Sequence, residues 1–133
     1  MKDSIPSTDS QPLVEISTTL PDDVVADGIA KFLVRHRWVA CAQVSCPITS
    51  TYHWQGDLEQ STECRLVVKT LAPLMPRVVE AIRERHPYSV PEITARSVEW
   101  VDPAYLQWAR ESVDWTCDPT EPRSVDRITH STL

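Results

Sequence analysis

The stretch that decides the fold runs from Trp38 to Thr70 and reads WVACAQVSCPITSTYHWQGDLEQSTECRLVVKT. Its first part, up to Trp54, is dense in Val, Thr, Ile, Ser and Tyr, residue types that favour strands. Pro47 interrupts this part and predicts a bulge or an edge position, because proline cannot donate a backbone hydrogen bond. The residues Gln55-Gly56-Asp57 are a turn signal. From Glu63 to Thr70 apolar and polar side chains alternate, so the stretch predicts an antiparallel hairpin with one buried face.

A strand and a helix are expected before this hairpin. The residues from Leu13 to Thr19 are β-prone, and the run ends at Leu20-Pro21. Proline suits the first turn of a helix, and the two aspartates that follow place negative charge at the positive end of the helix dipole. Apolar side chains at helical spacing extend this helix to about His36.

A helix, a strand and a last helix are expected after the hairpin. Thr70 is a candidate N-cap for a second helix. That helix ends at His86, because the proline that follows disfavours helical backbone in the residue before it. A fourth strand is expected from Ile93 to Val101, and Asp102-Pro103 begins the last helix.

The order of elements predicts the fold class. A β-α-β-β-α-β order with a terminal helix predicts an α+β, ferredoxin-like fold, in which the helices cover one face of an antiparallel sheet. The other face then needs polar residues or a partner chain. Because the run from Trp38 to Trp54 is too apolar for a fully solvated face, we expect self-association.

Composition limits the domain organisation and the classes of function. The 133 residues support one domain, expected at 12–113, with flexible extensions at 1–11 and 114–133 that are rich in Ser, Thr, Asp and Pro. The formal net charge of −6 argues against a nucleic-acid partner. Two glycines, Gly28 and Gly56, are too few and too far apart for a nucleotide-binding motif.

The cysteines and the apolar runs indicate a compartment. The four cysteines form no C-x-x-C pair, and no secretory segment stands at the start. No membrane segment is expected, because no run of about eighteen apolar residues occurs. We therefore predict a cytoplasmic protein with reduced thiols. Cys46 and Cys64 are expected as core or interface thiols, and Cys117 as an exposed one.

Seven short motifs, in order, give the chain a resemblance to a known family. They are Thr18-Thr19-Leu20-Pro21-Asp22, Val39-Ala40-Cys41-Ala42-Gln43, Ser50-Thr51-Tyr52-His53-Trp54-Gln55-Gly56, Glu59 with Glu63, Lys69-Thr70, His86-Pro87-Tyr88-Ser89-Val90-Pro91-Glu92, and Tyr105-Leu106-Gln107-Trp108. Over residues 12–112 the chain resembles the CutA divalent-cation tolerance proteins.

The resemblance implies a homotrimer similar to that of the PII signalling proteins, and a role in tolerance to copper and other divalent ions. It implies no catalytic reaction, so we expect no enzyme. Some members bind copper, but the positions of two of the three family ligands hold Thr18 and Arg85 here, and Arg cannot ligate a metal. Copper binding is therefore expected to be weak or absent, with His86 as the remaining candidate metal ligand.

The candidate ligand-binding residues are those that would surround a cleft between subunits, namely Cys41, Glu63, Lys69, Tyr88 and Glu92. Glu63 and Lys69 share the polar side of one strand, where the alternative is a pair of solvated charges. Cys41 needs a cationic neighbour to be an activated thiolate, and the alternative is a buried, inert thiol.

The remaining candidates also have two interpretations. His86 either presents a ring nitrogen to a metal or ligand, or hydrogen-bonds a helix end or packs at a subunit contact. Tyr52 and Trp54 stand beside the turn, and their predicted place is the trimer interface, since exposed tip aromatics invite association. A platform for stacking a nucleobase fits poorly with the acidic charge.

Three functions stay open from the sequence. The first is a binding or regulatory trimer whose inter-subunit clefts hold a metal ion or a small ligand. The second is a small ferredoxin-fold hydrolase that uses Cys41 or His86, although no set of nucleophile, base and orienting residue is visible. The third is a purely structural trimeric scaffold. No residue is assigned a catalytic role.

Overall fold

The computed structural model of the chain describes residues 13–114. It contains β1 (Leu13–Leu20), α1 (Asp23–Arg35), β2 (Cys41–Trp54), β3 (Asp57–Leu71), the 3-10 helix η2 (Ala72–Leu74), α2 (Met75–Arg85), β4 (Ile93–Ser97) and α3 (Pro103–Ser112). The expectations of flexible extensions at 1–11 and 114–133, and of an exposed Cys117, concern residues that lie almost wholly outside this range.

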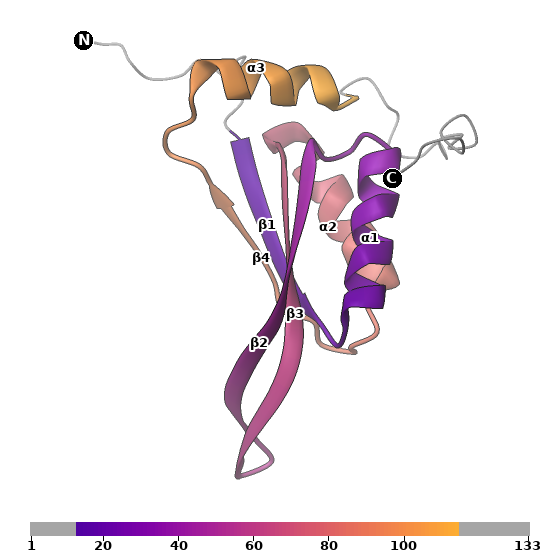
Figure 1. Cartoon of the computed structure of the whole chain (residues 1–133), viewed down its shortest axis with the longest axis vertical. Coiled ribbons are helices and arrows are strands. Elements are labelled where there is room, and N and C mark those ends of the chain that lie inside the picture. The colour runs from indigo at the N-terminus through magenta and orange to yellow at the C-terminus, as the bar shows by residue number, and fades with distance from the viewer. Residues whose placement is uncertain (1–12, 115–133) are drawn as a thin grey trace.

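The predicted ferredoxin-like arrangement is confirmed. The four strands form one antiparallel sheet in the order β2-β3-β1-β4. Helices α1 and α2 lie together against one face of this sheet, and α3 crosses its end (Figure 1). The core between helices and sheet is built from fully buried aliphatic side chains, among them Ile16, Leu33, Leu66, Val68 and Ile82. No helix of the described residues 13–114 covers the opposite face of the sheet.

The hairpin of β2 and β3 extends well beyond the rest of the sheet (Figure 1). Its loop is Gln55-Gly56, and both residues have left-handed backbone, with φ of 52° and 89°. Two such residues in a two-residue loop match the twist of the strands that they connect. The bulge predicted at Pro47 is confirmed, since the register between β2 and β3 shifts between Ser45 and Ile48.

Several predicted boundaries were wrong, for identifiable reasons. Thr70 is not a helix cap: β3 continues to Leu71, and the Thr70 hydroxyl donates to the backbone oxygen of Trp38 at 2.6 Å. β2 begins at Cys41, because Trp38 is buried in the preceding loop against Phe32. β4 ends at Ser97. Apolar residues in a buried loop and in a buried strand have the same pattern, so periodicity does not separate them.

The expected reduced state of two cysteines was also wrong. Cys46 of β2 and Cys64 of β3 form a disulfide, and their Cα atoms are 4.5 Å apart. The register shift at Pro47 brings the two residues across from each other, a spacing that a disulfide can bridge. Cys41 is a free, half-buried thiol. Among residues 13–114, no helix has the length and apolar character needed to cross a membrane.

Candidate functional site

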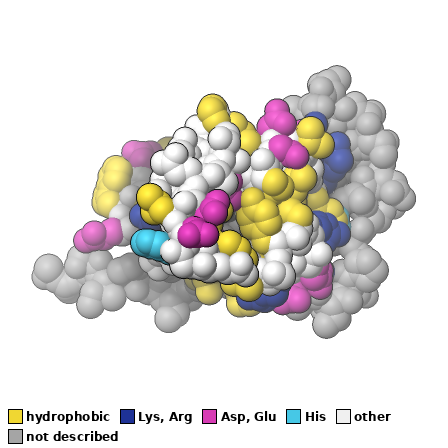
Figure 2. All heavy atoms as spheres, turned by 90° about the horizontal axis from the view of Figure 1, so that it is seen from below, with side chains coloured by type: hydrophobic (Ala, Val, Ile, Leu, Met, Phe, Trp, Pro, Cys, Tyr) yellow, Lys and Arg dark blue, Asp and Glu magenta, His cyan; other side chains and the backbone are white. Residues whose placement is uncertain are grey.

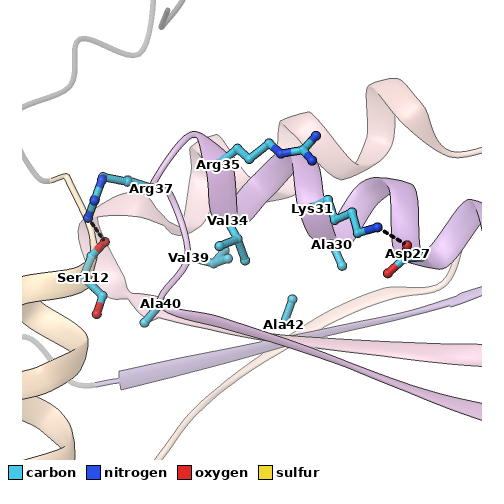
Figure 3. Close-up of a pocket in the computed structure, with 10 residues that line it drawn as sticks. All are labelled: Asp27, Ala30, Lys31, Val34, Arg35, Arg37, Val39, Ala40, Ala42 and Ser112. Carbon is cyan, nitrogen blue, oxygen red and sulfur yellow. Dashed lines mark hydrogen bonds and ion pairs between the residues drawn. The ribbon is translucent and has the colours of Figure 1, made fainter. Parts of the chain in front are cut away.

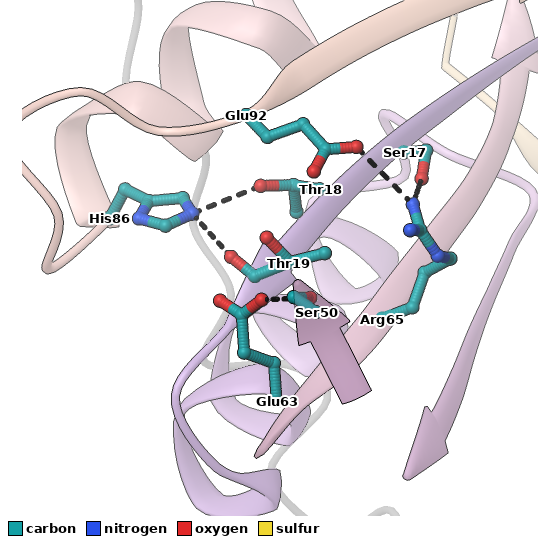
Figure 4. Close-up of polar contacts among 8 residues, drawn as sticks. All are labelled: Ser17, Thr18, Thr19, Ser50, Glu63, Arg65, His86 and Glu92. Atoms are coloured by element: carbon teal, nitrogen blue, oxygen red, sulfur yellow. Dashed lines mark hydrogen bonds and ion pairs between the residues drawn. The ribbon is translucent and has the colours of Figure 1, made fainter. Parts of the chain in front are cut away.

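A polar network lies where the long hairpin leaves the sheet, and we call it the hairpin-base network. It joins the end of β1, the two hairpin strands and the segment that follows α2 (Figure 4). Its members are Thr18, Thr19, Ser50, Glu63, His86 and Tyr88. Sequence order separates them widely, and the pairing of β3 with both β1 and β2, together with the return of the chain after α2, brings them together.

The ring of His86 has a partner at each nitrogen. Nδ1 accepts the backbone N–H of Tyr88 at 3.2 Å, so Nε2 carries the proton in the neutral ring. Nε2 lies 2.9 Å from the backbone oxygen of Thr19 and 3.0 Å from the Thr18 hydroxyl. Burial lowers the pKa of His86 below its ordinary value of 6.5, against the opposing effects of the Thr19 hydrogen bond and the Glu63 charge. The arrangement therefore favours a neutral imidazole that fastens the segment after α2 to β1.

The Glu63 carboxylate is held by hydroxyls. Its side chain is 9% exposed, and it accepts hydrogen bonds from Ser50 at 2.6 Å and from Tyr88 at 2.8 Å. Burial, followed by the hydrogen bond and charge of Glu63, raises the pKa of Tyr88 to about 12. Both donors are neutral, so the negative charge of Glu63 is retained at this point of the molecule.

Arg65 supplies the cation next to this network. It donates to the Ser17 hydroxyl at 2.6 Å, and the same nitrogen lies 3.5 Å from the Glu92 carboxylate. Ser17 and Arg65 alternate with the buried Ile16 and Leu66 along their strands, so this group faces the uncovered side of the sheet. Glu92 therefore stands between a cation on one side and the hairpin-base network on the other.

A cavity of about 670 Å³ opens beside the hairpin-base network, and we call it the hairpin pocket. One wall comes from the hairpin and the other from the end of β1 and the segment before β4. Its principal side chains are Tyr52, Trp54, Glu59, Glu63, Tyr88 and Glu92. Seen from the hairpin end, hydrophobic and acidic side chains lie next to one another on this side of the molecule (Figure 2).

A second group of expected residues lies at the other end of the sheet. Cys41 is the register partner of Lys69, whose ammonium donates to Gln43 at 3.1 Å and stands 6.0 Å from the centre of the Tyr105 ring. Burial raises the pKa of Tyr105, and the neighbouring Cys41 thiol adds to the effect. We call this group the Cys41 cluster.

The structure thus brings together Glu63, Tyr88, Glu92 and the neighbouring His86, but not Cys41 and Lys69. Lys69 lies six positions beyond Glu63 along β3, which is about 20 Å of extended strand. Tyr52 and Trp54 lie on the exposed half of the hairpin. Within one chain, then, the expected cleft residues form two groups along the same face.

Comparison with known proteins identifies the family. The model of the CutA1 divalent ion tolerance proteins matches residues 14–112. The chain belongs to the CutA1 divalent ion tolerance protein family. The divalent-cation tolerance protein CutA of Thermus thermophilus is 40% identical over 94 residues, which are 71% of this chain and 91% of that protein. Human Protein CutA is 37% identical over 100 residues, 75% of this chain but 56% of that protein. The chain therefore spans about half the length of its human relative.

Solved structures of CutA proteins share the fold. The Thermus thermophilus structure has a TM-score of 0.72 and 37% identity, covering 77% of this chain and 99% of that one. The Archaeoglobus fulgidus CutA, described as a periplasmic divalent cation tolerance protein, has a TM-score of 0.73 and 31% identity, covering 77% of this chain and 99% of that one. These similarities agree with the observed α+β sheet and terminal helix.

A copper site at the expected CutA positions does not fit the residues present. Thr18 is fully buried against His86, and the Arg85 guanidinium stacks over the Phe32 ring, with its carbon 3.4 Å from the ring centre. Both nitrogens of His86 already have partners. Within the described range 13–114, no three His, Cys, Asp or Glu side chains form a group that could hold a metal ion.

Sequence reasoning missed Ser50 and Tyr105 as side-chain partners of site residues. Ser50 appeared only as part of a family motif, and its contact with Glu63 depends on the shifted register of the hairpin. Tyr105 also appeared as part of a family motif, but the neighbouring Cys41 thiol helps to raise the pKa of its hydroxyl. Neither contact has a sequence signal, because both depend on where separate elements cross.

A second pocket, of about 530 Å³, lies between α1 and the start of β2 (Figure 3). Ala30, Val34 and Val39 give it an apolar floor, and basic side chains stand at its edge. Lys31 is paired with Asp27 at 2.9 Å, and Arg37 donates to the backbone oxygen of Ser112 at 3.4 Å. These charges have partners in the chain, so we do not assign the candidate site here.

Proposed function

We propose that this chain acts in divalent-cation tolerance as a homotrimeric binding or regulatory protein, with clefts between subunits for a metal ion or a small ligand. The observation that carries the proposal is the sheet order, because β2 and β4 are outer strands with no second neighbour among the described residues. The exposed aromatic side chains of the hairpin, Tyr52 and Trp54, support it as the predicted trimer interface.

Two open edges favour a closed ring of copies. An outer strand presents unpaired backbone groups that can add a further strand. If β2 of one copy pairs with β4 of the next, the contact joins two different surfaces, and repeating it closes a ring when the rotation fits. Three copies would leave no outer strand unpaired. Membership of the CutA1 family supports this number.

The same assembly accounts for the two groups of expected site residues. Glu63, Tyr88 and Glu92 lie near the base of the hairpin, and Cys41 with Lys69 lies near α3. We propose that groups from adjacent subunits face a shared cleft, which no single copy completes. No catalytic residue is included. Thr18 and His86 are 3.0 Å apart, but the Thr18 hydroxyl is fully buried and has no access to a substrate.

The metal part of the proposal concerns the family copper positions. Thr18 and Arg85 replace two ligands, so we propose that direct copper binding there is weak or absent. Calorimetric titration of the full chain with Cu²⁺ is then expected to give no stoichiometric heat at that site. Stoichiometric binding that His86→Ala abolishes would contradict this part.

The cytoplasmic location stays a prediction. The Cys46–Cys64 disulfide weighs against it, since disulfides persist mainly in oxidising compartments. The Archaeoglobus fulgidus relative is itself described as a periplasmic protein.

Hydrogen exchange on the intact chain tests the edge pairing. The expected result is protection along β2 and β4 that approaches the protection of β1, which pairs on both sides. Fast exchange along both outer strands, together with strong protection of β1, would contradict the assembly.

A further inference from the structure

We propose that the hairpin pocket binds an alkylated ammonium ion, an organic cation of the choline type. This inference deepens the proposed function and rests on it for the place of the pocket in the inter-subunit cleft, whereas the walls of the pocket itself all come from one copy. It depends on three features of the pocket: its charge, its aromatic walls and the spacing of its carboxylates.

The charge of the lining is negative. Glu59, Glu63 and Glu92 line the pocket, and none of its lining residues within the described chain is Lys, Arg or His. The partners of Glu63 are two hydroxyls, which leave its charge in place. Arg65 lies 3.5 Å from Glu92 and offsets that carboxylate, but it does not line the pocket. The pocket therefore favours a positively charged ligand.

Aromatic side chains stand on both sides. Tyr52 and Trp54 come from β2, and Tyr88 comes from the segment after α2. The Tyr88 hydroxyl is fixed to Glu63 at 2.8 Å, and the Tyr52 hydroxyl lies 3.4 Å from Ser61. With their hydroxyls held at the strands, the rings are walls of the cavity. Aromatic faces attract cations electrostatically, and alkylated ammonium ions are the ligands best suited to several such faces.

The carboxylates are spaced wrongly for a bare metal ion. A divalent cation needs several oxygen donors converging at about 2.0–2.6 Å. Throughout residues 13–114, His, Cys, Asp and Glu side chains form no such group of three. Dispersed carboxylates between aromatic walls suit a cation of larger radius. The volume of about 670 Å³ lies within the range of small-molecule sites rather than that of a single ion.

A matched pair of ligands isolates the charge. Choline and 3,3-dimethylbutan-1-ol have nearly the same shape, but only choline is charged. In calorimetric or ligand-observed NMR titrations of the full chain, we expect choline to bind at least about tenfold more tightly. Its affinity should fall as salt is added. Equal affinity for the two compounds, or no binding of choline, would overturn the inference.

Variants of Tyr88 separate the ring from the hydroxyl. Tyr88→Phe keeps the aromatic face and should retain most of the choline affinity, whereas Tyr88→Leu should lose about tenfold. Trp100→Leu is the control, because Trp100 is 74% exposed and lies outside the pocket. Equal losses in Tyr88→Phe and Tyr88→Leu, with folding preserved by circular dichroism, would overturn the role of the ring.

Sedimentation of each sample keeps this inference distinguishable from the proposed function. A trimer that does not bind choline overturns the ligand class and leaves the assembly standing. A single copy that binds choline in preference to its neutral analogue overturns the assembly and supports the ligand class.

Discussion

The two halves of β3 share one backbone ladder but have different surroundings. The proximal half, residues 64–71, pairs with β1 as well as β2, and alternate side chains enter the core. The distal half, residues 57–63, pairs with β2 alone. In this part of the hairpin, Leu58 of β3 is 69% exposed, and Tyr52 and Trp54 of the facing strand β2 are 44% and 61% exposed. The hairpin is therefore packed into the sheet and core of its own chain only where β3 pairs with β1.

The comparison shows what the distal half lacks. A two-stranded hairpin by itself is marginally stable in water. The Cys46–Cys64 disulfide fastens the two strands at the boundary between the halves, and the proposed neighbouring subunit covers what lies beyond. The proximal half should therefore respond to changes in the core, and the distal half to changes in assembly.

The largest effect is expected in the proximal half. Leu66 is fully buried in the core, so Leu66→Ala should lower the free energy of unfolding by about 2–5 kcal/mol. Val24→Ala on the exposed side of α1 is the control, with an expected change within about 0.5 kcal/mol. Denaturant titration measures both. Similar losses of unfolding free energy in Leu66→Ala and Val24→Ala would contradict the burial of the proximal half in the core.

The disulfide at the boundary should have the next largest effect. It closes a loop with a sequence separation of 18, for which the loss of chain entropy in the unfolded state corresponds to about 3 kcal/mol. Dithiothreitol should therefore lower the unfolding temperature of the wild type and of Cys41→Ser. It should leave the unfolding temperature of Cys46→Ser unchanged. A wild type that unfolds identically in both buffers would contradict a stabilising bridge.

A change in the distal half should act on assembly. Trp54→Ser removes a large exposed aromatic side chain from the predicted interface and should weaken association by about 2 kcal/mol or more. Sedimentation velocity over a dilution series measures the effect. Trp100→Ser, which removes a similarly exposed Trp elsewhere, should sediment like the wild type. Unchanged sedimentation of Trp54→Ser would remove this side chain from the interface.

The smallest effect concerns His86, which fastens the segment after α2 beside the boundary. Because burial lowers its pKa in the folded chain, the unfolded chain takes up the proton first as the pH falls. Its contribution to stability is complete above about pH 6.5 and is lost as the pH falls towards the folded-state pKa. His86→Gln should flatten this part of the stability curve, which denaturant titrations at a series of pH values measure. A slope retained in His86→Gln would contradict the assignment.

The fold could be predicted from the sequence because its elements have regular periods. Alternation in 64–70, the turn at Gln55-Gly56 and the proline interruption at Pro47 each have a local cause and gave the hairpin correctly. Thr70 was misassigned because a threonine before a proline-containing turn has the same local pattern whether it caps a helix or ends a strand.

The candidate site was predictable only in part. The family motifs pointed to Glu63, Tyr88 and Glu92, which the structure brings together. The Cys46–Cys64 disulfide and the contact of Ser50 with Glu63 depend on the size of the register step at the Pro47 bulge, which is one residue and which the proline alone does not specify. Cys41 and Lys69 lie apart from the hairpin pocket because Lys69 is six positions along β3 from Glu63 and Cys41 is its partner in β2, so the five expected cleft residues do not share one pocket within a chain.

The mass of the chain in solution tests most directly whether its outer strands and distal hairpin are covered by further copies. Light scattering on a sizing column, at micromolar concentration and in non-reducing buffer, gives that mass without a shape assumption. We predict a value near three times 15.1 kDa. A folded species of 15.1 kDa at every concentration would contradict the account.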